Sequence, residues 1–327
     1  MKVVITGGGG FLGLRLAKAL LARGTLAGAD GQAQKITRLT LLDTAFPAEV
    51  PDDPRLEPVT GDIADDRTLT AVVTPGTGSV FHLAAVVSGA AEAHFDLGMR
   101  VNLDGTRQLL EQIRKGGRAP RLVFTSSVAA FGGELPPVLD DSTIANPRTS
   151  YGTQKVIGEY LLADYTRKGF LDGRALRLPT IVVRAGKPNA AASSFASGII
   201  REPLNGEVSR CPVAPETGVW LLSPRRVVES LIHACELPAV AWGSRRVVNL
   251  PGISARVAEM VEAMRQVAGT GAARRVVYKP DARIQAIVKT WPVRFRTPRA
   301  IQMGFKPDSD VETVVRDYIA DEGIKID

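Results

Sequence analysis

The chain has 327 residues, of which 45% are hydrophobic and 23% charged, a composition typical of a globular protein with one large core or one core plus a small second domain. Two cysteines argue against a disulfide scaffold, no secretion signal or apolar run long enough to cross a membrane is evident, and we expect a cytoplasmic protein. The net charge of +7 comes from scattered basic residues and the three histidines lie far apart, which argues against nucleic-acid and metal sites and favours small anionic ligands.

Short apolar runs alternate with longer amphipathic stretches along the chain. We expect strands at residues 2–6, 37–42, 56–59, 80–83, 122–126, 174–183 and 246–250. We expect helices at residues 11–23, 67–73, 94–115, 150–168, 255–267 and 310–321. Strands that alternate with helices predict βαβ units, in which helices cover both faces of a parallel sheet.

A glycine cluster joins the first strand to the first helix, and it reads GGGGFLG from Gly7 to Gly13. Only glycine permits the tight turn and the close backbone approach that a pyrophosphate requires, and the next helix offers free N–H groups. A position after a strand and before a helix is the context that this motif needs. The sequence therefore predicts a dinucleotide site that includes Gly7, Gly10, Phe11, Leu12 and Gly13.

Asp43 follows the second predicted strand. A carboxylate at this position bonds the adenosine ribose and repels a 2′-phosphate, which favours NAD over NADP as the cofactor. Asp43 lies 30 residues after Gly13, beyond the usual spacing of about 20, and we expect residues 24–34 to form a lengthened loop. The alternative is a solvated carboxylate at a strand end.

The composition of the chain changes after residue 183. Residues 185–215 are rich in Gly, Pro, Asn, Ser and Ala and lack a helical or strand periodicity. Such a segment suits loops and short helices over a ligand site. We predict an α/β fold with a doubly wound parallel Rossmann sheet and a smaller C-terminal α/β substrate-binding region. The predicted NAD-binding domain spans residues 1–183 with 219–250 returning to it, and the substrate-binding region spans 184–218 and 251–327.

Tyr151 lies four residues before Lys155 in the helix predicted at 150–168. Positions i and i+4 share a helix face, so the phenol and the ammonium can point into one site. A nearby cation favours phenolate and lowers a tyrosine pKa from its usual value of about 10. The alternative is a solvated pair on a helix surface. Ser126 and Ser127 end the strand before this helix, at the edge where doubly wound sheets hold ligands.

These segments together resemble the extended short-chain dehydrogenase/reductase superfamily, which contains nucleotide-sugar epimerases and dehydratases. The resemblance runs nearly from end to end of the chain. The matching motifs are Thr6-Gly-x-x-Gly-x-x-Gly13, Asp62-Ile63, His82-Leu-Ala-Ala85, Asn102-x-x-Gly105-Thr106, Ser126-Ser127, Tyr151-x-x-x-Lys155 and Gly304-Phe-Lys-Pro307.

The resemblance implies a role for each matching residue. Tyr151 is the expected acid/base, Lys155 lowers its pKa and holds the nicotinamide ribose, and Ser127, rather than Ser126, bonds the reacting oxygen. Further cofactor contacts are expected from Asp62, Ile63, Leu83, Ala84, Ala85, Asn102, Pro179 and Ile181. Plainer alternatives stay open: residues 83–85 as core, Asn102 as a tie between backbone groups, and His82 as a packed histidine. The helices at 94–115 and 150–168 resemble those that form a dimer interface in this superfamily, so we expect a homodimer.

Residues 184–204 resemble the corresponding stretch of D-erythronate dehydrogenases, a branch of this superfamily. The implied reaction is the NAD-dependent oxidation of the C2 hydroxyl of D-erythronate to 2-dehydro-D-erythronate. The carboxylate of a small sugar acid needs a cation, and Arg184 and Arg201 are the main candidates. The expected substrate-binding residues are Ser88, Ser127, Tyr151, Arg184, Asn189, Ser193 and Arg201.

Other functions remain open at this point. Residues 128–131 contain no acid, which argues against a dehydratase. A nucleotide-sugar 4-epimerase and another sugar-acid dehydrogenase, such as a uronate dehydrogenase, are the alternatives within the superfamily. A non-catalytic NAD-binding module is disfavoured because Ser127, Tyr151 and Lys155 are all present.

Overall fold

The computed structural model describes residues 1–28, 31–186 and 193–326, and the chain forms two compact units. Unit 1 comprises Met1–Ser127, Thr149–Arg177 and Val228–Val248. Unit 2 comprises Val128–Arg148, Leu178–Val227 and Asn249–Asp327. The assignment of an NAD-binding domain and a substrate-binding region to particular parts of the chain stays a prediction.

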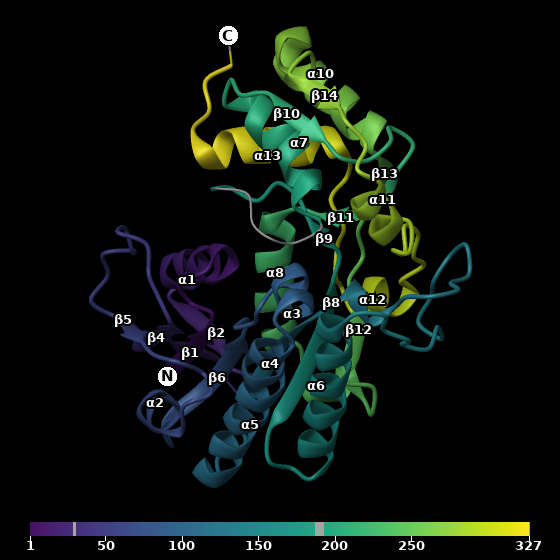
Figure 1. The fold of residues 1–327 in the computed structure, drawn as a ribbon. Helices are drawn as coiled ribbons and strands as arrows, with labels where there is room; N and C mark the ends of the chain where they lie inside the picture. Colours follow the sequence, from purple (N-terminus) through teal and green to yellow (C-terminus); the bar gives the residue numbers. More distant parts are fainter. Residues whose placement is uncertain (29–30, 187–192, 327) are drawn as a thin grey trace. The chain divides into compact units, whose positions relative to one another are not determined.

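Unit 1 is built around a seven-stranded sheet with the strand order β12-β8-β7-β6-β1-β4-β5 (Figure 1). The pairs β1–β4, β1–β6, β4–β5 and β6–β7 are parallel. The order reverses between β1 and β6, and this switch point is where doubly wound sheets hold their ligands. The strands are β1 (Lys2–Thr6), β4 (Arg38–Asp43), β5 (Leu56–Thr60), β6 (Thr77–His82), β7 (Arg121–Ser127), β8 (Asp172–Leu178) and β12 (Val247–Asn249). The predicted α/β fold class is confirmed.

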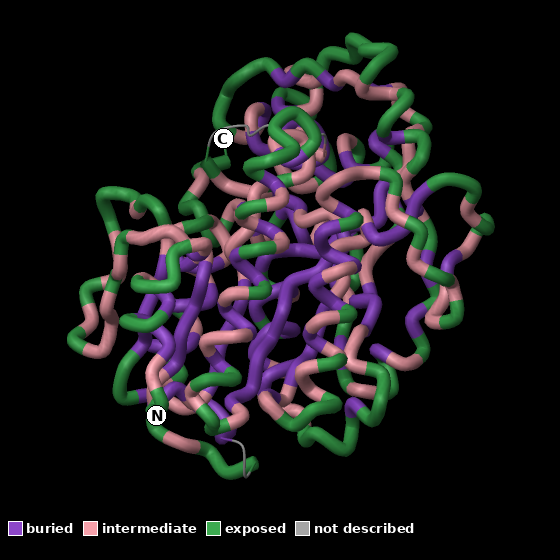
Figure 2. Tube along the Cα trace, turned by 60° about the horizontal axis from the view of Figure 1, so that its bottom comes forward, coloured by how far each residue is buried: buried purple, intermediate pink, exposed green. Residues whose placement is uncertain are grey.

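Helices cover this sheet, and its central strands are buried along most of their length (Figure 2). One apolar core joins Val4, Val80 and Leu122 of the strands to residues of α2, α5 and α6. Val3 and Ile5 alternate with Val4 and point to the opposite face, which α1 covers through its contacts with β1 and β4. The helices of unit 1 are α1 (Phe11–Arg23), α2 (Asp66–Val72), α3 (Ser88–Ala93), α4 (Phe95–Gly98), η1 (Met99–Asp104), α5 (Gly105–Gly116), α6 (Ser150–Arg167) and α9 (Ala239–Trp242), joined by the C-terminal part of α8 (Pro224–Glu236).

The structure corrects three expectations about single elements. The stretch 94–115, expected to be one helix, is α4, the π-helix η1 and α5 in succession. The segment 24–34, expected to be a plain loop, contributes the hairpin strands β2 (Thr25–Ala27) and β3 (Ala33–Lys35). The strand expected at 174–183 is broken at Pro179, which has no N–H to donate to a sheet, and the chain continues in β9 (Thr180–Ile181) of another sheet.

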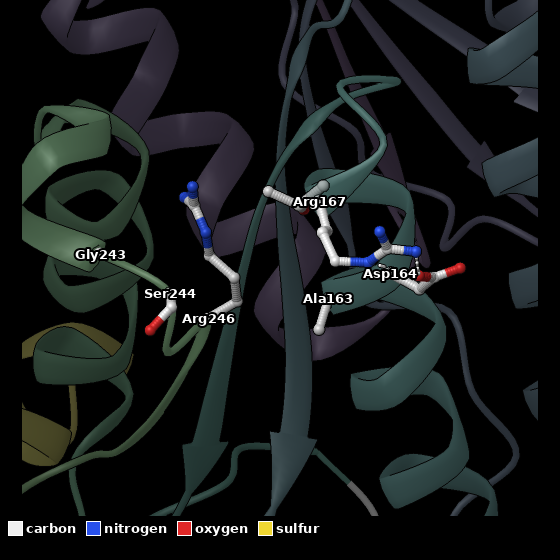
Figure 3. Close-up of a pocket in the computed structure, with 7 residues that line it drawn as sticks. Ala163, Asp164, Arg167, Gly243, Ser244 and Arg246 are labelled. Atoms are coloured by element: carbon white, nitrogen blue, oxygen red, sulfur yellow. Dashed lines mark hydrogen bonds and ion pairs between the residues drawn. The ribbon is translucent and has the colours of Figure 1, made fainter.

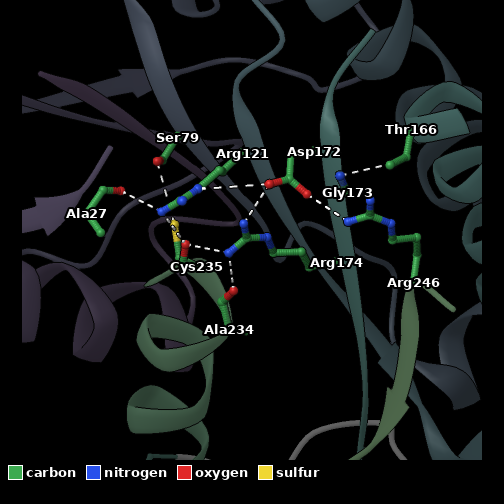
Figure 4. A network of polar contacts seen from close by, with 10 residues as sticks. All are labelled: Ala27, Ser79, Arg121, Thr166, Asp172, Gly173, Arg174, Ala234, Cys235 and Arg246. Atoms are coloured by element: carbon green, nitrogen blue, oxygen red, sulfur yellow. Dashed lines mark hydrogen bonds and ion pairs between the residues drawn. The ribbon is translucent and has the colours of Figure 1, made fainter. Parts of the chain in front are cut away.

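Three arginines of unit 1 converge on Asp172 at the start of β8 (Figure 4). Arg174 and Arg246 lie 2.6 and 2.9 Å from the carboxylate oxygens of Asp172, and Arg121 lies 4.0 Å away. Arg174 and Arg121 are 0% and 2% exposed, and both donate to the carbonyl oxygen of Cys235, at 2.5 and 3.0 Å. Because cations complement the negative end of a helix dipole, this network fastens the last turn of α8 to the sheet.

Unit 2 has its own core and two small sheets, β13-β11-β9 and β10-β14. Helix α10 packs on α7 and α13, and Ile199, Met260 and Val315 are fully buried between them. The strands are β9, β10 (Ser209–Cys211), β11 (Gly218–Leu222), β13 (Ile253–Arg256) and β14 (Val276–Tyr278). The helices are η2 (Val128–Ala130), α7 (Ser194–Leu204), the N-terminal part of α8, α10 (Val257–Ala273), α11 (Ala282–Val288), α12 (Pro298–Gln302) and α13 (Val311–Glu322).

Candidate active site

The glycine loop between β1 and α1 forms a cradle that side chains would fill. Gly7 has φ +72°, and a Cβ on it would lie 2.7 Å from the backbone nitrogen of Ala84. A Cβ on Gly13 would lie 2.2 Å from the carbonyl oxygen of Gly7, so α1 packs directly on the loop. Gly10 is exposed and caps α1 without a side-chain hydrogen bond, and the first turn of α1, which includes Phe11 and Leu12, carries no acidic residue. These features fit a pyrophosphate at the helix N-terminus.

Asp43 lies at the end of β4 beside the same loop. Its Oδ2 accepts a hydrogen bond of 3.0 Å from the backbone N–H of Gly9, and its Oδ1 accepts one of 2.8 Å from Thr44. A carboxylate oxygen accepts more than one hydrogen bond, so the fixed carboxylate keeps lone pairs for the hydroxyls of a ribose. The glycine loop and Asp43 together fit the adenosine diphosphate half of NAD.

Asp62 follows β5 and pairs with Arg100 of η1. Burial alone raises the pKa of Asp62, but the N–H of Ala64 and the guanidinium of Arg100 together hold it below its usual value. Ile63 is 5% exposed and belongs to the core under α5. The structure therefore places the carboxylate of Asp62 in an ion pair and the side chain of Ile63 in the core, and their contact with the cofactor stays a prediction.

His82 ends β6 and is 1% exposed. Its Nδ1 lies 2.7 Å from Oγ1 of Thr6, and its Nε2 lies 2.9 Å from Oγ1 of Thr106. Thr106 donates its own hydroxyl to the carbonyl oxygen of Asn102, so it accepts from Nε2–H, and Thr6 must donate to Nδ1. Burial, with a contribution from Lys155, lowers the pKa of His82 to about 3. The imidazole is therefore neutral and structural, as expected for a packed histidine.

Residues 83–85 follow His82 and line the loop beside the glycine cradle. Leu83, Ala84 and Ala85 are each half-buried, and Ala84 also packs against the apolar core of unit 1. Ala84 donates its N–H to Oγ1 of Thr6 at 3.4 Å. A side chain on Gly7 would clash with the backbone of Ala84. Leu83, Ala84 and Ala85 thus lie next to the dinucleotide cradle.

Tyr151 and Lys155 project from the first turns of α6. Thr149 caps this helix by accepting a hydrogen bond of 3.1 Å from the N–H of Gly152. Lys155 is 2% exposed, with its Nζ 5.5 Å from the centre of the Tyr151 ring and 4.8 Å from that of Phe124. Burial lowers the pKa of Lys155 to about 7, although the carboxylate of Glu159 opposes this shift. The spacing on the helix therefore brings the phenol and the amine together.

The two serines at the end of β7 have different surroundings. Ser126 is 2% exposed and donates its hydroxyl to Oε1 of Glu159. Arg177 of β8 donates to both oxygens of the same carboxylate, at 2.8 and 2.6 Å. Ser127 is half-buried at the last position of the strand. The hydroxyl of Ser126 is thus used within the protein, and Ser127 is the serine at the strand end.

Asn102 and Gln154 form a polar contact that ties η1 to α6. The amide of Asn102 donates to Oε1 of Gln154 at 2.8 Å and to the carbonyl oxygen of Val86 at 3.1 Å, and it accepts from the N–H of Val86 at 2.7 Å. Asn102 therefore connects the loop after β6 to the residue before Lys155. Sequence reasoning overlooked Gln154, Glu159 and Arg177; a polar residue adjacent to Lys155 and a carboxylate one turn beyond it were the available signals.

The predicted substrate residues fall in both units. Ser88 begins α3 in unit 1. In unit 2, Arg184 donates from Nη2 to the hydroxyl of Ser193 at 2.9 Å. Arg201 is 6% exposed, donates to the carbonyl oxygen of Arg184 at 2.9 Å and pairs with Glu202 at 2.6 Å. Pro179 precedes β9 and Ile181 ends it, and Asn189 lies outside the described residues.

A cavity of about 390 Å³ lies at the C-terminal end of α6 in unit 1 (Figure 3). Its lining includes Arg167, which pairs with Asp164 at 2.7 Å, and Arg246, which pairs with Asp172 at 2.9 Å. Both arginines thus have a carboxylate partner within the protein, although Arg246 shares Asp172 with Arg121 and Arg174. None of the lining residues belongs to the predicted active site.

Comparisons with known proteins identify the family of the chain. Residues 3–222 match the NAD dependent epimerase/dehydratase family. The chain is 58% identical over 324 residues to D-erythronate dehydrogenase of Cupriavidus necator, covering 99% of both chains. It is 45% identical over 319 residues to D-erythronate dehydrogenase of Haemophilus influenzae, covering 98% of this chain and 99% of that one. A crystal structure described as a nucleoside-diphosphate-sugar epimerase from Agrobacterium tumefaciens is 40% identical, with a TM-score of 0.92 over 100% of this chain and 96% of that one.

The chain belongs to the NAD dependent epimerase/dehydratase family. It is an NAD-dependent dehydrogenase that acts on a CH–OH group, and NAD is its cofactor; these predictions are confirmed. No helix in the described ranges has the length and apolar character needed to span a bilayer.

Proposed function

We propose that this enzyme oxidises the C2 hydroxyl of D-erythronate to 2-dehydro-D-erythronate with NAD, using Ser127, Tyr151 and Lys155. The identity of 58% over 99% of both chains with a D-erythronate dehydrogenase is the observation that carries the choice of substrate. The arrangement of the tyrosine and the lysine on α6 supports the choice of chemistry.

Tyr151 acts as the base that removes the proton of the C2 hydroxyl. The Nζ of Lys155, 5.5 Å from the ring centre, stabilises the phenolate electrostatically when it carries a proton. Ser127 holds the reacting oxygen so that its proton faces Tyr151. NAD, when bound, accepts the hydride that leaves C2 as the carbinol becomes a ketone.

The glycine loop, Asp43 and the loop at residues 83–85 bind the cofactor in this proposal. Gly7, Gly10 and Gly13 give the pyrophosphate close access to the first turn of α1. Asp43 bonds the adenosine ribose and repels a 2′-phosphate, so we expect a preference for NAD over NADP. The other residues of the proposed cofactor set are Phe11, Leu12, Asp62, Ile63, Asn102, Tyr151, Lys155, Pro179 and Ile181.

Arg184 is the residue that we propose to bind the substrate carboxylate. The guanidinium of Arg201 already pairs with Glu202 and holds the carbonyl oxygen of Arg184, so its role within unit 2 is to support the Arg184 backbone. Arg184→Ala should raise KM for the acid about tenfold or more, while Arg210→Ala, which removes an exposed arginine of the same unit, should not. Wild-type KM in both Arg184→Ala and Arg201→Ala contradicts a clamp by either residue.

A panel of sugar acids with NAD and with NADP tests the substrate. The proposal predicts the largest kcat/KM for D-erythronate with NAD and the formation of one NADH for each acid consumed. A larger kcat/KM for a uronate or another sugar acid contradicts the assignment of D-erythronate but keeps the enzyme class.

A nucleotide-sugar 4-epimerase is the alternative activity within the family to be checked beside the dehydrogenase reaction, since a structure 40% identical to this chain is described as a nucleoside-diphosphate-sugar epimerase. An epimerase returns the hydride to the product, so it yields an isomerised sugar without net NADH. Incubation with a nucleotide sugar and analysis of the products therefore distinguishes the two functions.

We also propose that the enzyme is a homodimer located in the cytoplasm. Phe95 and Leu97 of α4 are 58% and 39% exposed, and Tyr160 of α6 is 72% exposed. These apolar side chains lie on the segments that resemble the dimer-forming helices of the superfamily, and large exposed apolar groups are common at interfaces. Light scattering of the purified protein measures the oligomeric state directly.

A further inference from the structure

Tyr151, Lys155 and Glu159 stand at successive four-residue steps along α6, so they share one face of the helix. Lys155 is 2% exposed and Glu159 is 4% exposed. Burying an ionisable group without a partner is costly. A buried carboxylate one helical turn beyond a buried amine therefore indicates that the two groups interact.

The carboxylate of Glu159 is held by two neighbouring strands. Arg177 of β8 forms a two-pronged contact with it, through Nε at 2.8 Å and Nη2 at 2.6 Å. Ser126 of β7 donates its hydroxyl to the same carboxylate. Such bidentate pairs fix the geometry of a carboxylate as well as its charge. The side chain of Glu159 is therefore held in one orientation against β7 and β8.

Among the described residues, the ionisable groups that interact with Lys155 include His82, Tyr151 and Glu159. His82 ends β6 and is neutral, and Tyr151 and Glu159 share the helix of Lys155. Arg177 of β8 is the ion-pair partner of Glu159. From η1, the amide of Asn102 reaches α6 next to Lys155, at Gln154. Burial disfavours a charged Lys155, and the Glu159 carboxylate acts in the opposite direction.

We propose that Glu159 is a positioning residue of the active site, whose carboxylate keeps Lys155 protonated beside Tyr151 and fixes the end of β7 at which Ser127 lies. Arg177 and Ser126 hold this carboxylate in place. The importance of a protonated Lys155 for turnover rests on the proposed function, but its protonation can be measured without substrate or cofactor.

The test is an NMR titration of the protein without cofactor, with lysine labelled at the ε-carbon and Lys155 assigned from a Lys155→Met spectrum. Glu159→Gln should lower the pKa of Lys155 by about 1 unit, which at pH 7 reduces the protonated fraction and the turnover about fivefold. Glu159→Gln leaves the Arg177 guanidinium without its carboxylate, and this cation by itself also lowers the pKa of Lys155. The double variant Glu159→Gln/Arg177→Met removes both charges, so it should still lower the pKa of Lys155 but by less than the single variant. Replacing both partners of a buried pair is often tolerated.

Asp164→Asn is the matched control, since it removes a carboxylate from the same helix and breaks an exposed pair with Arg167. It should leave the pKa of Lys155 and the pH profile of kcat unchanged. An unchanged Lys155 pKa in the folded double variant overturns the proposal, whatever the enzyme does with D-erythronate. Lack of wild-type activity on D-erythronate, with the expected pKa shift present, overturns only the proposed substrate.

Discussion

Asn102 of η1 donates a hydrogen bond of 2.8 Å to Gln154 of α6, the residue that precedes Lys155. Asn102 also makes both backbone contacts of Val86, and it is 3% exposed. Asn102→Ala removes these hydrogen bonds from the buried amide of Gln154 and from the half-buried backbone of Val86. We expect the free energy of unfolding to fall by about 3 kcal/mol, measured by urea denaturation, with a drop in kcat as α6 loses its anchor.

Gln112→Ala is the control for this change. Gln112 is a half-buried amide on the neighbouring helix α5 with longer contacts, 3.4 Å to the carbonyl oxygen of Val73 and 3.5 Å from Thr70. Its loss should change the unfolding free energy by less than about 0.5 kcal/mol. Equal effects of the two substitutions contradict the anchoring role of Asn102.

Two glycines of the cofactor loop should respond differently to alanine. A Cβ on Gly13 would lie 2.2 Å from the Gly7 carbonyl oxygen, so Gly13→Ala should destabilise the protein by about 2 kcal/mol or more. A Cβ on exposed Gly10 lies 3.2 Å from that oxygen, and Gly10 has an ordinary φ of −76°. Gly10→Ala should therefore keep its stability but bind NAD at least about tenfold more weakly, because its methyl occupies the approach of the pyrophosphate. Denaturation and NAD titration separate the two effects, and unaltered NAD binding by Gly10→Ala argues against this loop as the pyrophosphate site.

His82 should make the protein sensitive to acid. Burial lowers the pKa of His82 from 6.5 to about 3. At a pH between these two values, the unfolded chain therefore carries a proton on His82 that the folded chain lacks. The stability that depends on neutral His82 is present above pH 6.5 and is lost as the pH falls towards 3. Between pH 7 and pH 5, the wild type should lose about 2 kcal/mol more than His82→Gln does.

His94→Gln provides the comparison for His82, since His94 is exposed. Its unfolding free energy should follow the wild-type dependence on pH. If the His82→Gln protein shows that same dependence, the imidazole of His82 is not the group that couples folding to protons.

The buried amine of Lys155 should lower the free energy of unfolding. Its pKa in the folded state is about 7, below the usual 10.5, so the unfolded chain binds more protons between these values. The free energy of unfolding is therefore reduced at and below neutral pH. Lys155→Met removes the buried charge at similar volume and should raise the unfolding free energy by about 2 kcal/mol at pH 7 while abolishing turnover.

The control for this stability gain is Lys168→Met, at the exposed C-terminal end of the same helix. Its effect should be smaller than about 0.5 kcal/mol. A Lys155→Met protein that is less stable than the wild type contradicts the buried, desolvated amine described above.

Much of the fold was predictable because its signals are local. β1 and α1 were predicted with their observed bounds, since an apolar run, a glycine turn and a helical period follow one another directly. The π-helix η1 was missed because its residues continue the helical period of α4 and α5, and the change in hydrogen bonding has no marker in the sequence. The break at Pro179 was visible as a proline within an apolar run, a position that favours the end of a strand.

The active site was predictable to the extent that spacing on one element defines it. Tyr151 and Lys155 are four residues apart, so their contact follows from the helix itself. Glu159 continues the same spacing, but its partners Arg177 and Ser126 come from two other strands, and only the sheet order brings them together. Arg201 is followed directly by Glu202 on α7, but adjacent residues of a helix do not normally face each other, so the pairing of Arg201 with Glu202 was not expected from the sequence.

The most direct test of the central claim is the formation of NADH from D-erythronate and NAD by the purified wild type and by Tyr151→Phe. We predict one NADH for each D-erythronate oxidised by the wild type. The phenylalanine variant should bind NAD with unchanged affinity but turn over at least about a hundredfold more slowly, because it lacks the general base. Full turnover by Tyr151→Phe, or consumption of D-erythronate without NADH, would contradict the account.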